Sequence, residues 1–283
     1  MDMGKYLFAF DIDGTLETGT REIDPELIKI IKTIQDNGNA VSLITGRLCS
    51  GSIDVAGKLD LVSGSFISGG DGGSFYIWNG KNNKPDAKKF NFLEKDSIVD
   101  ILQEFNPPGI IMYENTIDLV GNVSGLIKHL ARISTPDITT VSSWNEIDFS
   151  RSVTGLRFIV PTTKYREFIN TMENYSGNST EFFRGDDFDN TLTGISVRKQ
   201  GIDKASALEY ICTELNIDIG NTVSFGDWIT DIPLLKRAKT GFCPVDAHDR
   251  VKNTADNVSL KKIQENWVTD CLSAFMNKPD EQE

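Results

Sequence analysis

Short apolar runs alternate with an amphipathic stretch over the first fifty residues, a pattern typical of strand, helix and strand in succession. The run YLFAF at 6–10 lacks polar alternation, which predicts a strand buried on both faces of a parallel sheet. Asp24 and Pro25 predict a helix start, and Gly38 predicts its end. The run AVSLI at 40–44 predicts the next strand. A right-handed crossover would bring the carboxyl ends of both strands to one edge of the sheet.

A second unit of this kind occurs late in the chain. Asp203 predicts the cap of a helix whose apolar residues recur at helical spacing. The run TVSF at 222–225 then predicts a strand that ends at Gly226 and Asp227. Residues 230–238 are expected to form the following helix, with Pro233 tolerated in its first turn.

The middle of the chain, at 81–191, differs in composition and has clusters of Asn, Pro and Lys. Here GLRFIV at 155–160 predicts a strand and KYREFINTMENY at 164–175 predicts a helix. A length of 283 residues agrees with two domains. The predicted fold class is α/β: a doubly wound, Rossmann-like parallel sheet core built from 1–80 and 192–283, with an α+β cap domain inserted at 81–191.

The charge and composition of the chain limit the kinds of molecule that it is expected to bind. The chain has 41 acidic and 29 basic residues, a formal net charge of −12 and no long basic run, which argues against nucleic acid as a partner. An acidic protein can still bind a small phosphorylated metabolite where a divalent cation reverses the local potential. No apolar run is long enough to predict membrane insertion, and four widely spaced cysteines indicate a reduced, cytoplasmic protein. The sequence leaves the oligomeric state open between a monomer and a small homo-oligomer.

Four motifs occur in a fixed order and carry the candidate chemistry. They are DIDGT at 11–15, LITGR at 43–47, Lys204 at the start of a predicted helix, and GDWITD at 226–231. Together they resemble the haloacid dehalogenase (HAD) superfamily of aspartate-dependent phosphohydrolases. The long insertion after the second motif resembles the large cap, class IIB, of the Cof-type sugar-phosphatase branch. The resemblance implies a phosphatase that hydrolyses a small phosphomonoester, with a sugar phosphate as the expected substrate.

The resemblance implies roles that also make chemical sense. Asp11 would attack phosphorus and form an aspartyl-phosphate, which divides one difficult displacement into two easier ones. Asp13 would give a proton to the leaving oxygen and later take one from the attacking water. Thr45 and Lys204 would stabilise the transferred phosphoryl group and count as catalytic residues with the two aspartates. The implied substrate-binding set is Thr45, Gly46, Arg47, Lys204 and Arg184.

A crowd of carboxylates at one sheet edge calls for a cation, and Mg²⁺ prefers oxygen ligands. By resemblance, the ligands would be the Asp11 carboxylate, the Asp13 backbone carbonyl and the Asp227 carboxylate. Asp231 completes the candidate metal set, where it would orient water or Lys204 rather than bind the ion directly.

Several positions depart from the family pattern or keep two interpretations. Thr230 stands where Cof-type members usually carry Asn, and Asp71 stands where they often carry Asn. Arg184 belongs to FFRGDDFDN at 182–190, which is either a cap loop facing the substrate or a solvated hairpin tip. Three tryptophans are expected to be packing anchors rather than a stacking platform: Trp78, Trp144 and Trp267.

Two other functions stay open at this stage. A phosphomutase would share the aspartyl-phosphate but pass the group to a sugar hydroxyl. A non-catalytic phospho-receiver or ligand-sensing module would use the acidic pocket without turnover. Receiver domains are much shorter than this chain and lack a second acid such as Asp13, which favours catalysis.

Overall fold

The computed structural model describes residues 5–18, 22–81, 83–93, 96–123, 135, 137–176, 180–188 and 191–277. The chain divides into two compact units, each built from separate segments. The first comprises Met1–Thr45, Ser52–Lys88 and Asp203–Glu283, and the second comprises Gly46–Gly51 and Lys89–Ile202.

An eight-stranded sheet forms the centre of the first unit, with the strand order β14-β13-β12-β1-β2-β3-β4-β5. Neighbouring strands from β14 to β3 pair in parallel, and β4 pairs with β3 in antiparallel fashion. The strands are β1 (Leu7–Phe10), β2 (Ala40–Ile44), β3 (Phe66–Gly69), β4 (Ser74–Ile77), β5 (Asp86–Phe90), β12 (Thr222–Phe225), β13 (Thr240–Cys243) and β14 (Asn257–Val258). The parallel core expected from the sequence is confirmed, and β1 lies between β12 and β2.

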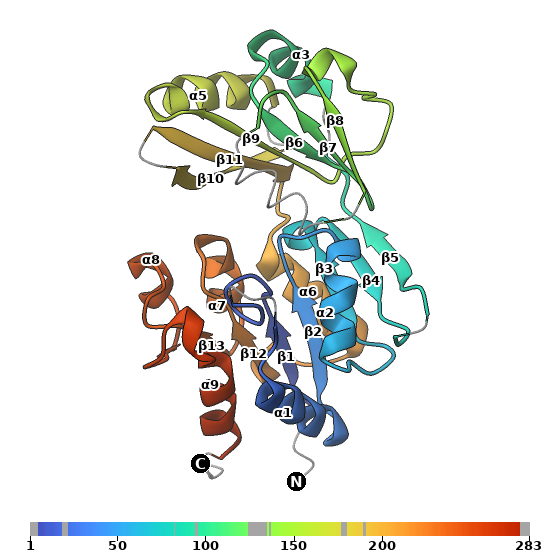
Figure 1. Ribbon diagram of the computed structural model, residues 1–283, viewed down its shortest axis with the longest axis vertical. Coiled ribbons are helices and arrows are strands. Elements are labelled where there is room, and N and C mark those ends of the chain that lie inside the picture. Colours follow the sequence, from blue (N-terminus) through green and yellow to red (C-terminus); the bar gives the residue numbers. More distant parts are fainter. Residues whose placement is uncertain are drawn as a thin grey trace. The chain divides into compact units, whose positions relative to one another are not determined.

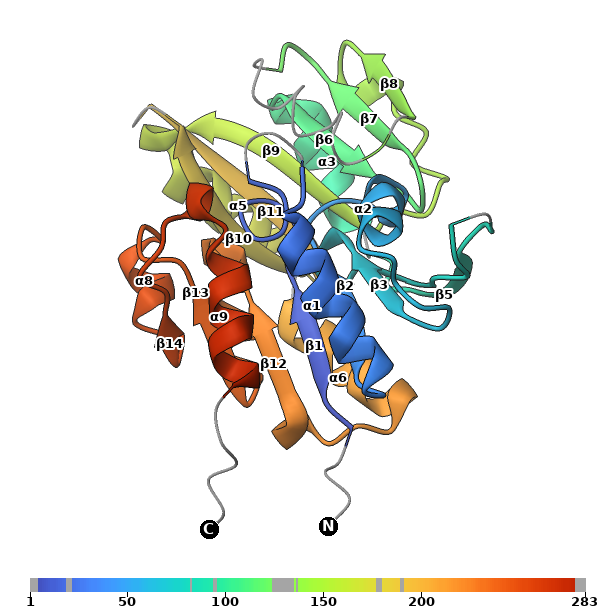
Figure 2. The same cartoon turned by 60° about the horizontal axis from the view of Figure 1, so that its bottom comes forward.

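Helices cover both faces of this sheet (Figures 1 and 2), with α1 beside α9 on one face and α6 beside α7 on the other. The helices of the unit are α1 (Pro25–Asp36), α2 (Ile53–Lys58), α6 (Lys204–Leu215), α7 (Ile232–Arg237), α8 (Asp249–Lys252) and α9 (Trp267–Met276). The helix starts predicted at Pro25 and after Asp203 are correct. The Asp24 carboxylate accepts the Glu26 N–H, and the Asp203 carboxylate accepts the Ser206 N–H.

Alternate residues of β1 serve the two faces, which explains its fully apolar sequence. Leu7 and Ala9 belong to the core cluster that includes the buried side of α6. Phe8 points to the opposite face, where its ring meets Phe275 of α9 edge to face. Buried aliphatic and aromatic side chains on both faces supply the main stabilisation of the fold.

The second unit has a six-stranded sheet with the order β10-β11-β9-β6-β7-β8. Its strands are β6 (Gly109–Met112), β7 (Ile117–Val120), β8 (Ile138–Val141), β9 (Gly155–Pro161), β10 (Thr180–Phe188) and β11 (Leu192–Lys199). All the pairs are antiparallel except β7 with β8. Residues of α3 (Asp96–Phe105) and α5 (Tyr165–Ser176) share one apolar cluster with the sheet. The expected strand at 155–160 and the expected helix at 164–175 are both present.

Three details differ from the sequence expectations. β11, expected in the core, pairs with β9 and β10 of the second unit, whereas β5, expected in the cap, joins the sheet of the first unit. FFRGDDFDN does not form a loop or hairpin tip over its described part, because 182–188 belong to β10. The helix expected at 230–238 begins at Ile232, after a turn of 3₁₀ helix at Ile229–Asp231.

Within the part of the chain that the structure describes, no helix combines the length and the apolar character that crossing a membrane requires. All four cysteines are described; each is buried, and none forms a disulfide.

Candidate active site

The carboxyl ends of three neighbouring parallel strands bring distant motifs together. Asp11 follows β1 directly, Thr45 follows β2 directly, and Asp227 lies two residues beyond β12. The Asp11 N–H donates to the Phe225 carbonyl at 3.0 Å, which continues the β1–β12 ladder to the edge of the sheet. Strand pairing therefore fixes the backbone positions of the first and last motifs relative to each other.

Lys204, the first residue of α6, lies at the centre of a group of buried carboxylates. Its ammonium Nζ lies 2.6 Å from Asp11 Oδ1 and 2.5 Å from Asp231 Oδ1. Asp71 Oδ1 lies 3.7 Å from the same nitrogen. Only 1% of Lys204 is exposed, so this cation acts in a desolvated environment where its charge has a strong effect.

The turn after Asp11 is shaped to fit Asp227. Thr15 Oγ1 donates to Asp227 Oδ1 at 2.8 Å and so braces this turn. Gly14 has a φ of +83°, and a Cβ at this position would overlap the Asp227 carboxylate. The Gly14 carbonyl accepts the indole N–H of Trp267 at 3.1 Å. A side chain at position 14 is therefore excluded twice, by backbone conformation and by space.

Asp231 holds the last motif in its conformation. Its Oδ2 accepts the backbone N–H groups of Asp227 and Trp228 at 3.1 and 2.9 Å, while its Oδ1 faces Lys204. These bonds hold residues 227–231 in a tight turn and explain why α7 begins only at Ile232. Both oxygens of Asp231 thus have partners, which agrees with the orienting role expected for this residue.

The electrostatics of the group are unfavourable for so many anions. Burial, opposed by Lys204 and reinforced by Asp231 and Asp13, raises the pKa of Asp11 to about 8. Burial and the charges of Asp231 and Asp11 raise the pKa of Asp227 well above its usual range. Burial alone would lower the pKa of Lys204, but the surrounding carboxylates overcome this effect and raise it.

The donor set fits a hard divalent cation. Asp11, Asp227 and Asp231 each offer a carboxylate oxygen, and these three oxygens lie within 4.8 Å of one another. The buried side chains of Asp11, Asp71, Asp227 and Asp231 oppose a single ammonium group, so four negative charges and one positive charge leave three negative charges in excess if all are ionised. A cation with oxygen ligands would relieve this excess.

The other expected site residues lie as follows. Asp13 is exposed and forms a β-bridge with Glu17. Thr45 is fully buried, and its carbonyl accepts the Asp71 N–H at 2.9 Å. Gly46 and Arg47 belong to the second unit. There the Gly46 carbonyl accepts from Arg157 Nη2 at 3.1 Å, and Arg47 Nη1 donates to the Gly51 carbonyl at 3.3 Å.

Arg184 lies in β10, opposite Ile195 of β11, and a bulge follows it before Asp187. Its side chain is outside the described part of the structure. The substrate-binding role of Arg184 stays a prediction.

The sequence leaves the role of Asp71 open and predicts only a packing role for Trp267. Asp71 is buried beside Lys204 and has a φ of +54°. A signal was present in the surrounding glycines at 69, 70, 72 and 73, since a polar residue in a glycine-rich turn after a strand is typical of a site. Trp267 carried no local signal, because its contact with Gly14 joins opposite ends of the chain.

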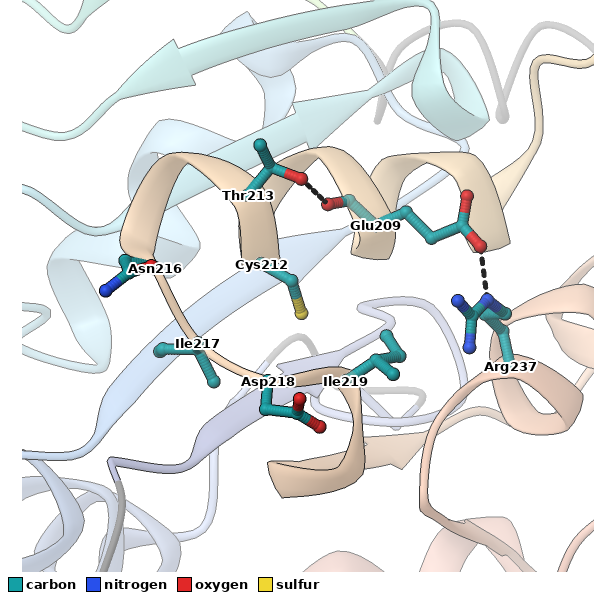
Figure 3. A pocket seen from close by; sticks show the side chains of 8 residues that line it. All are labelled: Glu209, Cys212, Thr213, Asn216, Ile217, Asp218, Ile219 and Arg237. Atoms are coloured by element: carbon teal, nitrogen blue, oxygen red, sulfur yellow. Dashed lines mark hydrogen bonds and ion pairs between the residues drawn. The ribbon is translucent and has the colours of Figure 1, made fainter.

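A separate hollow of about 780 Å³ lies at the other end of α6 (Figure 3). Its lining includes Cys212, Asn216 and Ile219, and an ion pair joins Glu209 to Arg237 at its rim. Lys204 begins α6, whereas the hollow is lined by residues of the second half of this helix and of the segment that follows it. The hollow therefore belongs to the amino-terminal side of the sheet, away from the carboxylates.

Gly14→Ala is expected to destabilise the protein by about 2–4 kcal/mol, because it combines left-handed backbone strain with the overlap on Asp227. Gly38→Ala is the matched control. Gly38 has a φ of +82° but nothing within 4 Å of the added Cβ, so about 1 kcal/mol of backbone strain is expected. Urea unfolding of both variants measures the difference, and equal losses would show that Asp227 does not restrict position 14.

A comparison with protein families identifies the family to which these motifs belong. The model of the haloacid dehalogenase-like hydrolases matches residues 8–271, which include every motif of the site. The fold agrees as well. The HAD subclass IIB sugar phosphatase BT4131 superposes with a TM-score of 0.77 at 20% identity, covering 96% of this chain and 99% of that one. The resemblance to the haloacid dehalogenase superfamily and the predicted fold class are confirmed.

Curated relatives extend over almost the same span. The 5-amino-6-(5-phospho-D-ribitylamino)uracil phosphatase YcsE of Bacillus subtilis (strain 168) is 27% identical over 264 residues, 93% of each chain. A phosphoglycolate phosphatase of Methanospirillum hungatei is 26% identical over 258 residues, 91% of each chain. The expectation of an enzyme of the phosphatase class is confirmed. With its motifs joined around Lys204 and a family match over nearly its full length, the chain belongs to the haloacid dehalogenase-like hydrolases.

Proposed function

We propose that the chain is a Mg²⁺-dependent phosphatase that hydrolyses a small phosphomonoester, a sugar phosphate in the first instance, through an aspartyl-phosphate on Asp11. One observation supports this proposal above the others. Segments around Asp11, Lys204 and Asp227, far apart in the sequence, meet in a buried group at one sheet edge. An acidic group of this kind suits phosphate only when a cation accompanies it.

Asp11 would attack phosphorus while Asp13 protonates the ester oxygen, so the alcohol leaves and an aspartyl-phosphate forms. Asp13 would then take a proton from water, which attacks the same phosphorus and releases inorganic phosphate with Asp11 restored. The exposed position of Asp13 leaves its carboxyl accessible to a leaving group and to water. Lys204 lowers the pKa of Asp11 against the effect of burial, and it would supply positive charge to the phosphoryl oxygens.

Mg²⁺ would be held by the carboxylates of Asp11 and Asp227 with the backbone carbonyl of Asp13, and it would supply positive charge for the phosphate group. Asp231 would position Lys204 and the Asp227 loop rather than bind the ion, because its oxygens already serve that ammonium group and two backbone N–H groups. Thr45 would donate its hydroxyl to a phosphoryl oxygen. The second unit would act as the cap, and its closure would exclude water and select the leaving group.

The substrate class also has support from relatives. YcsE is named for a ribityl phosphate that carries an aminouracil ring, and the Methanospirillum enzyme is named for phosphoglycolate. Both substrates are small phosphomonoesters, which agrees with the proposed class. The sequence has no long run of lysine and arginine that would indicate a nucleic-acid partner. The cytoplasm stays the predicted compartment.

Removal of the metal provides the test. With p-nitrophenyl phosphate and a panel of sugar phosphates, Mg²⁺ is expected to support phosphate release, and EDTA is expected to lower the rate at least about tenfold. Mg²⁺ at 100 times its Kd should also stabilise the protein by about 2.7 kcal/mol in thermal unfolding. Activity that survives EDTA would contradict metal dependence. Conversion between hexose phosphate isomers without free phosphate would indicate a mutase instead.

A further inference from the structure

The four tryptophans of the chain, all within the described residues, divide sharply by exposure. Trp78, Trp144 and Trp267 are 0–1% exposed, and the indole N–H of each donates to a backbone carbonyl. The expectation that these three are packing anchors is confirmed. Trp228 is 41% exposed, so a substantial part of this large apolar residue faces water.

Trp228 lies in the loop that carries the candidate metal ligand. It follows Asp227 directly, and its backbone N–H donates to Asp231 Oδ2 at 2.9 Å. The other oxygen of that carboxylate lies 2.5 Å from Lys204, which in turn contacts Asp11. Two bonds thus connect the backbone of Trp228 to the ammonium group at the centre of the site. These bonds fix the backbone position from which the indole extends.

An exposed indole beside a site suits a flat partner. Stacking between an aromatic side chain and a planar base contributes about 1–3 kcal/mol, because both flat faces leave water together. An acyclic polyol gains less, since its hydroxyl groups lose hydration against an apolar face. Neither Lys204 nor the neighbouring carboxylates offer such a surface, so Trp228 adds an element of recognition that the phosphate-handling groups do not provide.

We propose that Trp228 is a specificity residue whose indole stacks on a flat heterocyclic ring in the leaving group, so that the enzyme prefers phosphomonoesters that carry such a ring. This inference rests on the proposed function and narrows its substrate class. The preference concerns the leaving group alone, and Trp228 takes no part in the transfer of the phosphoryl group.

Matched esters isolate the contribution of the ring. Uridine 5′-monophosphate and ribose 5-phosphate share the same primary phosphate and differ by the uracil, and FMN and ribitol 5-phosphate differ in the same way by the isoalloxazine. The wild type is expected to show a higher kcat/KM for the ring-bearing member of at least one pair. Trp228→Ala should lower that kcat/KM roughly 5- to 150-fold and change the value for the ringless partner less than about twofold.

Trp228→Tyr should restore most of the preference, because tyrosine keeps a flat ring. Equal kcat/KM values within both pairs would overturn the proposal, and so would a Trp228→Ala variant that loses activity equally on both members of a pair. Phosphate release by the wild type from neither pair, nor from p-nitrophenyl phosphate, would contradict the proposed function instead.

Fluorescence tests the contact without turnover. Acrylamide should quench chiefly Trp228, because the other three indoles are buried. In an Asp11→Asn background, uridine 5′-monophosphate with Mg²⁺ is expected to reduce the quenching constant at least about twofold, whereas ribose 5-phosphate should leave it unchanged. Equal protection by both esters, or none by either, would count against the stack even if hydrolysis failed.

Discussion

Asp11→Asn is expected to lower kcat for phosphate release by about 10⁴-fold or more. The amide keeps the size of the side chain but removes the nucleophilic carboxylate, and loss of a covalent nucleophile has effects of this order in other enzymes. Steady-state release of inorganic phosphate from p-nitrophenyl phosphate and from the best sugar phosphate measures the change.

The loss should not come from unfolding. Burial raises the pKa of the Asp11 carboxyl to about 8, so its charge is disfavoured in the folded protein, and a neutral amide removes that penalty. Thermal unfolding in EDTA should therefore show Asp11→Asn at least as stable as the wild type. Asp36→Asn is the control, because Asp36 is an exposed carboxylate on α1 that pairs with Lys32. A variant at position 11 that retains more than about a hundredth of wild-type kcat would contradict the nucleophile assignment.

Local chemistry explains which features the sequence could predict. Asp24 with Pro25, and Asp203 before Lys204, are helix starts because their side chains satisfy nearby N–H groups, an effect that depends on a few consecutive residues. Likewise, a strand buried on both faces must be apolar throughout, so β1 could be identified directly. The ordered motifs then included Asp11 and Asp231, two of the three carboxylates that lie within 4 Å of Lys204.

Features set by long-range contacts could not be predicted in this way. The polar sequence GDD in β10 is typical of turns, but pairing with β11 holds it in a strand, and the register shift between Arg184 and Asp187 accommodates the irregular part. The start of α7 depends on the Asp231 carboxylate. Because this carboxylate binds the N–H groups of Asp227 and Trp228, the residues before Ile232 form a tight turn instead of extending the helix. The place of Asp71 beside Lys204 follows from the pairing of β3 with β2; the glycines around Asp71 indicate a turn but do not indicate which residues it contacts.

Lys204→Met is expected to destabilise the metal-free protein by about 3–5 kcal/mol at pH 8, because it leaves buried carboxylates without their cation. Asp11, Asp71 and Asp231 all lie within 4 Å of the ammonium nitrogen, and Lys204 lowers the pKa of Asp11 in the wild type. Without Lys204 the pKa of Asp11 must rise further. Phosphatase activity should be lost as well, since the same ammonium group would stabilise the phosphoryl oxygens.

The loss should depend on pH with a definite sign. A buried carboxyl whose folded pKa exceeds its unfolded value stabilises the fold fully below the unfolded pKa, 3.8 for Asp11, and this contribution disappears as pH rises towards the folded pKa. Below about pH 8 the two proteins should lose this contribution in parallel; because only the variant keeps losing it above the wild-type folded pKa, its deficit relative to the wild type should grow between pH 7 and pH 10. Urea unfolding in EDTA at both pH values measures it, with Lys29→Met at an exposed ion pair on α1 as the control. A deficit that is equal at both values would mean that Lys204 stabilises the fold by packing rather than by charge.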